Sequence, residues 1–178
     1  MIEKKICMLG AFAVGKTSLV RRFVASCFSD EYQTTIGVTV DKKTLSMDGR
    51  PATLVLWDLY GEDEFQKLRR SYLRGSSGYL VVLDGMRRAT LDIALHIQLT
   101  AADALGPVPF VVLINKLDRR PDWEVTDQDL VQLAQRGWTV LLTSAKTGQG
   151  VEEAFTALTR AMLGTPQEPP PAGTPDGS

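Results

Sequence analysis

Residues 6–17 read Ile-Cys-Met-Leu-Gly-Ala-Phe-Ala-Val-Gly-Lys-Thr, an apolar run that leads into a turn bounded by glycines. The last eight of these residues fit the pattern G-x-x-x-x-G-K-T. The apolar run predicts a buried strand, and the helical spacing of residues 17–24 predicts a helix directly after the turn. A strand, this loop and a helix in that order predict an α/β domain whose loop binds phosphate groups.

The rest of the chain continues the alternation of strands and helices. Further strands are predicted at residues 38–47, 51–57, 79–83, 110–114 and 138–142, and helices at 90–105, 127–135 and 151–163, with helical character also from about residue 64. Asp48-Gly49-Arg50 predicts a hairpin turn between the second and third strands. We therefore expect a three-layer α/β fold: a six-stranded, mostly parallel sheet with one antiparallel edge strand and about five helices.

Composition limits the classes of protein and partner. Residues 1–163 predict one globular domain, whereas residues 164–178 are rich in proline and polar residues and are expected to be disordered. The net charge of −1 gives no electrostatic footprint for nucleic acid, and basic pairs such as Arg87-Arg88 are interpreted as solvated surface. Cys7 and Cys27 make no disulfide framework, and no apolar run reaches the roughly 18 residues of a membrane span. We expect a cytoplasmic protein without a signal peptide.

The loop at residues 10–17 has the composition needed to hold a nucleotide's phosphates. Backbone N–H groups and the positive end of the following helix would wrap the β-phosphate. Lys16 would place its charge between the β- and γ-phosphates, and the Thr17 hydroxyl would bind Mg²⁺. An ordinary glycine turn before a helix is the alternative. The residues expected to line the phosphates are Ala13, Val14, Gly15, Lys16, Thr17 and Ser18.

A second motif, Asp58-Leu59-Tyr60-Gly61, follows the predicted strand at 51–57. A carboxylate at the end of a strand can hold the metal, usually through water. Gly61 can offer its N–H to a terminal phosphate because no side chain blocks the approach. Taken alone, this D-x-x-G pattern would more often be a simple turn.

Two later motifs indicate which base is bound. Asn115-Lys116-Leu117-Asp118 follows the strand at 110–114, and Ser144-Ala145-Lys146 follows the last strand. An aspartate at position 118 can accept hydrogen bonds from guanine N1–H and from the 2-amino group, a donor pair that adenine lacks. The Ala145 N–H could meet guanine O6. In isolation the first motif is also a common surface loop, but together with the phosphate motif it favours GTP over ATP.

With these motifs in this order, residues 3–163 resemble a Ras-superfamily small GTPase, most similar to the Rab and Rho branches. The resemblance implies a GTP/GDP-binding molecular switch with Mg²⁺ and slow GTP hydrolysis. Thr35 would bind Mg²⁺ and the γ-phosphate, Phe28 would stack on guanine, and Tyr32 would be a mobile switch residue. Effector proteins would bind the two switch loops, at about 28–40 and 59–74, and exchange or activating proteins are further candidate partners. Metal ligands would be Thr17, Thr35 and Asp58.

Two residues depart from the family pattern near the reacting phosphate. Glu62 stands where relatives have a glutamine that orients water, and an ionised carboxylate only accepts hydrogen bonds and repels the γ-phosphate. Phe12 replaces a small residue and would obstruct the entry of an activator's arginine. We therefore expect slow hydrolysis. The expected catalytic residues are Lys16, Thr35, Gly61 and Glu62, of which Glu62 has the least defined role.

Lipid attachment is not expected, because the last cysteine is Cys27 and position 2 is Ile2. This resembles bacterial or archaeal members of the superfamily, some of which act with roadblock-type partners. Two other functions remain open: a nucleotide-locked scaffold with negligible hydrolysis, and an ATP-dependent phosphotransferase that shares only the phosphate loop. His96 lies within a predicted helix and is not expected to act as a base, and Trp123 has no assigned role.

Overall fold

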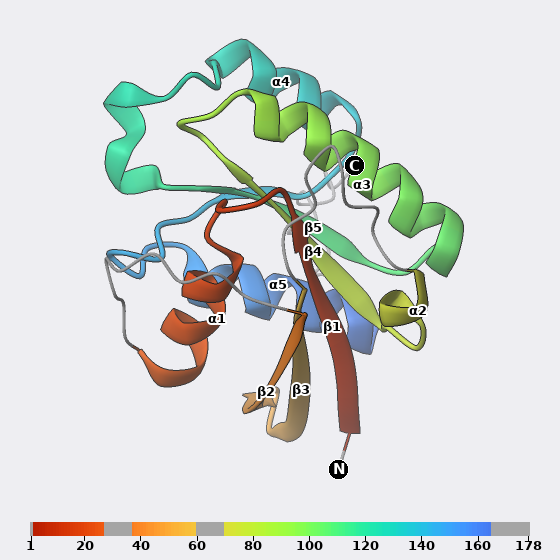
Figure 1. Ribbon diagram of the computed structural model, residues 1–178. Helices are drawn as coiled ribbons and strands as arrows, with labels where there is room; N and C mark the ends of the chain where they lie inside the picture. The colour runs from red at the N-terminus through yellow and green to blue at the C-terminus, as the bar shows by residue number, and fades with distance from the viewer. Residues whose placement is uncertain (1, 27–36, 60–69, 165–178) are drawn as a thin grey trace, which may run out of the picture.

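The computed structural model describes residues 2–26, 37–59 and 70–164. Strands and helices alternate along most of the chain (Figure 1). The strands are β1 (Ile2–Gly10), β2 (Val38–Met47), β3 (Arg50–Leu59), β4 (Gly78–Asp84), β5 (Phe110–Asn115) and β6 (Val140–Leu142). The helices are α1 (Lys16–Ala25), α2 (Arg70–Leu73), α3 (Ala89–Leu105), the 3₁₀ helix η1 (Leu117–Asp122), α4 (Asp127–Gln135) and α5 (Val151–Leu163).

The six strands form one sheet in the order β2-β3-β1-β4-β5-β6. Only β2 runs antiparallel to its neighbour, and every other pairing is parallel. The predicted three-layer α/β fold is therefore confirmed. Because β1, β3, β4 and β5 run in the same direction, their carboxyl ends reach one edge of the sheet, where ligands bind in open α/β folds.

Helices cover both faces of the sheet (Figure 1). Alternate residues of β1 point to opposite faces: Ile6 and Met8 pack with α1 and α5, whereas Cys7 and Leu9 pack with α2, α3 and α4. All four side chains are buried, which explains why the strand is a continuous apolar run in the sequence. On the first face, Phe23 of α1 stacks on Phe155 of α5 with ring centroids 4.0 Å apart.

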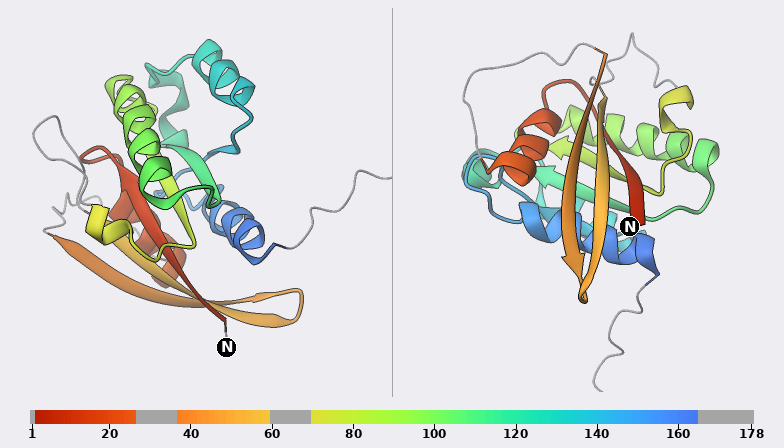
Figure 2. Two further views of the ribbon diagram at one scale, coloured as in Figure 1. Left: turned by 90° about the vertical axis from the view of Figure 1, so that its right-hand side faces the viewer. Right: turned by 90° about the horizontal axis from the view of Figure 1, so that it is seen from below.

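The hairpin of β2 and β3 forms one margin of the sheet (Figure 2). Its turn lies at Asp48 and Gly49, both with positive φ (53° and 79°), as a tight turn between twisted strands requires. The outer strand, β2, pairs only with β3 among the described residues. It carries Asp41, Lys42 and Lys43 in succession near its centre.

The predicted ranges agree closely with the structure for the helices at 127–135 and 151–163. The hairpin strand β3 is longer than predicted and β6 is shorter. The 3₁₀ helix η1 was not predicted, because its sequence contains Pro121 and has no helical periodicity. The expected disorder of residues 164–178 stays a prediction, because all of them except Gly164 lie outside the described part of the chain. In that part, no helix has the length and apolarity to cross a bilayer.

Candidate nucleotide site

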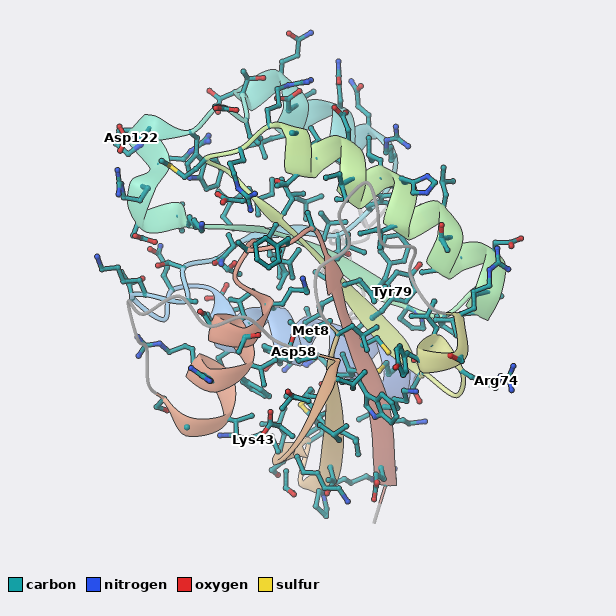
Figure 3. All side chains as sticks on the ribbon, viewed as in Figure 1. Met8, Lys43, Asp58, Arg74, Tyr79 and Asp122 are labelled. Carbon is teal, nitrogen blue, oxygen red and sulfur yellow. The ribbon has the colours of Figure 1, made fainter. Side chains whose placement is uncertain are left out.

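The sequence motifs meet at the edge of the sheet where the parallel strands end. Met8 on β1 and Asp58 on β3 are register partners close to this edge, and Figure 3 shows them side by side. The loop after β1, residues 10–17, is called the phosphate loop below. The loops at 115–118 and 144–146 follow β5 and β6 and are called the first and second base loops.

The phosphate loop has a backbone that few residue types adopt. Ala13 has φ 59° and Gly15 has φ 102°. A Cβ atom on Gly15 would lie 2.2 Å from Nδ2 of Asn115, so a side chain at this position would collide with the first base loop. For Ala13, the left-handed conformation costs on the order of 1 kcal/mol, and such strain occurs most often at ligand-binding sites.

Lys16 begins α1 and folds back over the phosphate loop. Its ammonium Nζ donates to the carbonyl oxygens of Gly10 and Ala11, both at 3.0 Å. The side chain is buried, and burial lowers the pKa of Lys16 to about 8; the Asp58 carboxylate opposes this shift and the Arg87 guanidinium adds to it. A buried ammonium with neutral carbonyl partners is well placed to receive an anion.

Thr17 and Asp58 form a pair suited to a divalent cation. The Thr17 hydroxyl donates to Oδ2 of Asp58 at 2.5 Å, while Oδ1 of Asp58 is buried and accepts no hydrogen bond from the described residues. Burial raises the pKa of Asp58, and the hydrogen bond from Thr17 opposes the rise. An unpaired buried carboxylate oxygen beside a hydroxyl is a hard-oxygen donor set, which fits Mg²⁺.

Asn115 joins the phosphate loop to the second base loop. Its Nδ2 donates to the carbonyl oxygen of Val14 at 3.0 Å. Its Oδ1 accepts from the Thr143 hydroxyl at 3.2 Å and from the Ala145 N–H at 3.3 Å. One buried amide side chain therefore fixes the distance between the loop suited to phosphate and the loops suited to a base.

Asp118 is exposed at the start of η1, and one of its oxygens is held in place. The Ser144 hydroxyl donates to Oδ1 of Asp118 at 2.7 Å and itself accepts from the Thr147 N–H at 3.1 Å. The second carboxylate oxygen of Asp118, together with the outer side of the first, can accept from a planar ligand. Lys146 follows Ala145 in the same loop and is exposed.

Two residues that support the first base loop, Asp84 and Trp123, were not identified from the sequence. Lys116 has φ 74° and pairs with Asp84, the buried last residue of β4, with Nζ and Oδ2 2.8 Å apart. The indole Nε1–H of Trp123 donates to the Lys116 carbonyl at 2.8 Å, and its ring packs against Gly85. The only sequence signal for Asp84 was that an aspartate ends an apolar strand. For Trp123 the sequence offered no signal.

Arg22 supports the second base loop. Its guanidinium donates from Nε to the carbonyl oxygen of Ala145 at 2.8 Å and from Nη2 to that of Lys146 at 2.5 Å. These bonds run from α1 to residues more than 120 positions later, so no local sequence pattern could have indicated them. Arg22 therefore holds the loop that follows β6 against the helix that follows the phosphate loop.

Several predicted residues lie outside the described part of the chain: Phe28, Tyr32, Thr35, Gly61 and Glu62. Within the phosphate loop, the Phe12 side chain is 45% exposed. His96 is exposed on α3, away from the loops that end the strands. The structure thus brings together the predicted residues of the phosphate loop, Asp58 and both base loops in one place.

Comparison with known proteins gives a consistent result. A family model described as "Ras family" matches residues 5–164. The chain is 36% identical over 162 residues to the Ras-related protein Rab-4A of Homo sapiens, covering 89% of this chain and 74% of that protein. It is 35% identical over 162 residues to the human Ras-related protein Rab-4B (89% and 76%), and 36% identical to Rab-4A of Danio rerio over the same length and shares.

Proposed function

The chain belongs to the Ras family of GTP-binding switch GTPases, and we propose that it is a Mg²⁺-dependent GTP/GDP switch with slow hydrolysis. The observation that carries this proposal is the Asn115 side chain, which ties the phosphate loop at Val14 to the second base loop at Ala145. A ligand that fills both sides of this bridge must carry phosphates at one end and a base at the other. A nucleotide meets that requirement.

We assign guanine recognition to Asp118. Its Oδ1 is already oriented by Ser144, which reduces the entropy lost when the carboxylate accepts from a base. Guanine presents two donors, N1–H and the 2-amino group, to such a carboxylate, whereas adenine would leave it unpaired. Lys116 of the first base loop and Lys146 of the second base loop would lie on either side of the base. The Ala145 N–H belongs to the second base loop.

The experiment for this assignment is Asp118→Asn with affinities for GDP, XDP and ADP measured by competition. Because hydrogen bonds to a charged group contribute about 1.5–3 kcal/mol, GDP affinity should fall roughly 10- to 100-fold or more. Xanthosine diphosphate (XDP) has a carbonyl at C2, which can accept a hydrogen bond from the amide introduced in the variant. XDP should therefore bind the variant more tightly than it binds the native chain. Asp122→Asn is the matched control, since this carboxylate lies on the same η1 helix and pairs only with Arg119 among the described residues. Unchanged GDP preference in the first variant would refute the assignment.

We assign metal binding to Thr17 and Asp58, joined by Thr35 from outside the described part of the chain. Bound Mg²⁺ supplies positive charge that neutralises the phosphate oxygens. Lys16 and the N–H groups of the phosphate loop would stabilise charge at the same phosphates, and Gly61 would contribute an N–H. Asp58→Ala should weaken the dependence of nucleotide retention on free Mg²⁺, which titration with a chelator measures.

We attribute slow hydrolysis to Glu62 and Phe12. Ionised Glu62 would only accept hydrogen bonds where water must be oriented, and it would repel the γ-phosphate. Phe12 presents an exposed ring on the phosphate loop, at the side from which an activator's arginine would come. Single-turnover phosphate release from the native chain, Glu62→Gln and Phe12→Gly measures both effects. A faster rate in Glu62→Gln supports this account; a slower one shows that the carboxylate takes part in hydrolysis.

Glu62 and Phe12, together with Tyr60, favour a second candidate, a nucleotide-locked scaffold with negligible turnover. Absence of phosphate release over hours, with GTP still bound, would identify that function. An ATP-dependent phosphotransferase is disfavoured by Asp118 and would require ATP to compete with GDP.

For partners, we propose effector proteins at the two switch loops, about 28–40 and 59–74, together with exchange or activating proteins. Roadblock-type proteins are one candidate class among these exchange or activating partners.

A further inference from the structure

Arg87 reaches the phosphate loop from the turn between β4 and α3. Its Nη2 donates to the carbonyl oxygen of Phe12 at 2.7 Å. The contact spans 75 positions of sequence and follows from the sheet order, because β4 lies next to β1 and the two strands end at the same edge. The sequence predicts that the Arg87-Arg88 pair lies on solvated surface. The structure leaves the Arg87 side chain 44% exposed but directs its guanidinium to the loop.

The guanidinium of Arg87 is held by a buried carboxylate. Nε of Arg87 donates to Oδ2 of Asp84 at 3.1 Å, and the Asp84 side chain is 1% exposed. Oδ1 of Asp84 accepts from the Met86 N–H at 2.8 Å, while Lys116 pairs with Oδ2 at 2.8 Å. The carboxylate therefore carries two cations. One belongs to the first base loop, and the other contacts the phosphate loop.

The peptide geometry of the loop gives the Arg87 contact a direction. In a trans peptide the C=O and the next N–H point to opposite sides. Arg87 holds the Phe12 carbonyl, Lys116 lies 3.5 Å from the Ala13 carbonyl, and Asn115 holds the Val14 carbonyl at 3.0 Å. Three successive carbonyls thus have cationic or amide donors from the β4 and β5 ends of the sheet. Because these peptides are trans, the N–H groups of the next three residues point away from those donors.

Arg87 also adds charge to a region that is already positive. Lys16 and Lys116 are two further cations near the loop; the Asp84 carboxylate pairs with Lys116, and the Asp58 carboxylate acts on Lys16 by electrostatic attraction. Burial is the main cause that lowers the pKa of Lys16, and repulsion by Arg87 adds to it, so the two cations are close enough to act on each other. A polyanion between them would remove that repulsion.

We propose that Arg87 is a positioning residue of the phosphate site, which orients the Phe12–Ala13 peptide and supplies a second positive charge for the terminal phosphates. This inference rests on the proposed function. Arg87 acts within the same chain, through the carbonyl of Phe12. It favours nucleotides that carry more than one phosphate and leaves recognition of the base to Asp118.

The test compares the affinities of GTP, GDP and GMP for the full chain and for Arg87→Ala, Arg87→Lys and Arg88→Ala. GMP is measured at millimolar concentration by displacement of a fluorescent GDP analogue. Arg88→Ala is the matched control, because it removes the same charge one position away, from a residue paired with Asp129 on α4. The Arg87→Ala variant should fold, since Asp84 keeps Lys116 as its partner.

In Arg87→Ala, affinity for GTP and GDP should fall roughly 10-fold or more, as for loss of a charged hydrogen-bond donor. Affinity for GMP should change by less than about 2-fold, and Arg87→Lys should recover part of the loss because it retains the charge. An equal loss for all three nucleotides, or a loss no larger than in Arg88→Ala, would overturn the inference. If the native chain binds no guanine nucleotide, the proposed function fails instead, and the two failures are distinct.

Discussion

Replacing Asn115 with alanine should weaken the whole site, because this side chain makes three buried hydrogen bonds between separate loops. Each such bond contributes about 0.5–1.5 kcal/mol net, so their loss should lower the free energy of unfolding by about 3 kcal/mol. Part of that cost arises because the buried Ala145 N–H and the Val14 carbonyl lose a partner. For a domain of this size the melting temperature should fall by roughly 6–12 °C.

Graded variants can separate the bonds of Asn115. Thr143→Val removes only the hydroxyl that donates to Asn115 Oδ1 and should cost about 1 kcal/mol. Asn115→Asp keeps an acceptor for the Ala145 N–H but places an oxygen against the Val14 carbonyl oxygen, so it should be among the most damaging. Chemical denaturation at a fixed, saturating GDP concentration measures the stability of each variant, and stopped-flow release of labelled GDP measures retention.

Nucleotide release gives the decisive comparison for Asn115. If the side chain couples the two halves of the pocket, Asn115→Ala should accelerate GDP release far more than Thr100→Ala, a half-buried α3 control whose hydroxyl donates to the His96 carbonyl of its own helix. A destabilisation below about 1 kcal/mol would refute the reasoning. So would a release rate equal to that of the control, because the three bonds would then contribute nothing to holding the ligand.

Gly15→Ala should lose nucleotide affinity and stability, by about 1–3 kcal/mol, because its φ is 102° and its Cβ would lie 2.2 Å from Asn115; native-like GDP binding in calorimetry would contradict this. Arg22→Ala should speed GDP release about 10-fold with little change in melting temperature, and equal release rates would argue against its role in holding the second base loop. Hydrogen bonding from Arg88 lowers the pKa of Asp129, so the folded state gains stability above the ordinary aspartate pKa and loses it as pH falls through the lowered value. Asp129→Asn should therefore cost about 1 kcal/mol at pH 7, and the difference from the native chain should shrink as pH falls below the ordinary aspartate pKa of about 4 and vanish only below the lowered folded-state pKa; a difference in urea unfolding that stays constant from pH 7 to acid pH would exclude the charge as its source.

The sequence predicted the fold well where burial alone decides structure. The runs that became β1, β4 and β5 are apolar on both faces because helices cover both faces, and this makes them visible without any alignment. The turn at Asp48 and Gly49 was also predictable, since few residue pairs adopt positive φ in succession. The boundaries of the strands were predicted less accurately. For example, β6 is shorter than predicted because only Val140–Leu142 pair with β5.

The supporting residues of the site were not predictable in the same way. Asp118 and Lys16 lie in motifs whose residue types are set by the ligand, so they can be found from spacing. Arg22 and Arg87 act through backbone carbonyls of distant segments, and Trp123 through the carbonyl of Lys116, seven positions earlier. A carbonyl is present at every position and leaves no trace in the sequence. Such contacts become visible only when the sheet order places the loops beside one another.

The outer strand β2 has a consequence for encounters between copies of this molecule. A ten-residue strand that has a neighbour on one side only among the described residues would ordinarily invite another strand to extend the sheet and start aggregation. Where two copies of β2 meet antiparallel with Lys42 opposite Lys43, two pairs of like charges lie directly across from each other. That register of edge-to-edge pairing between copies is therefore disfavoured by charge repulsion.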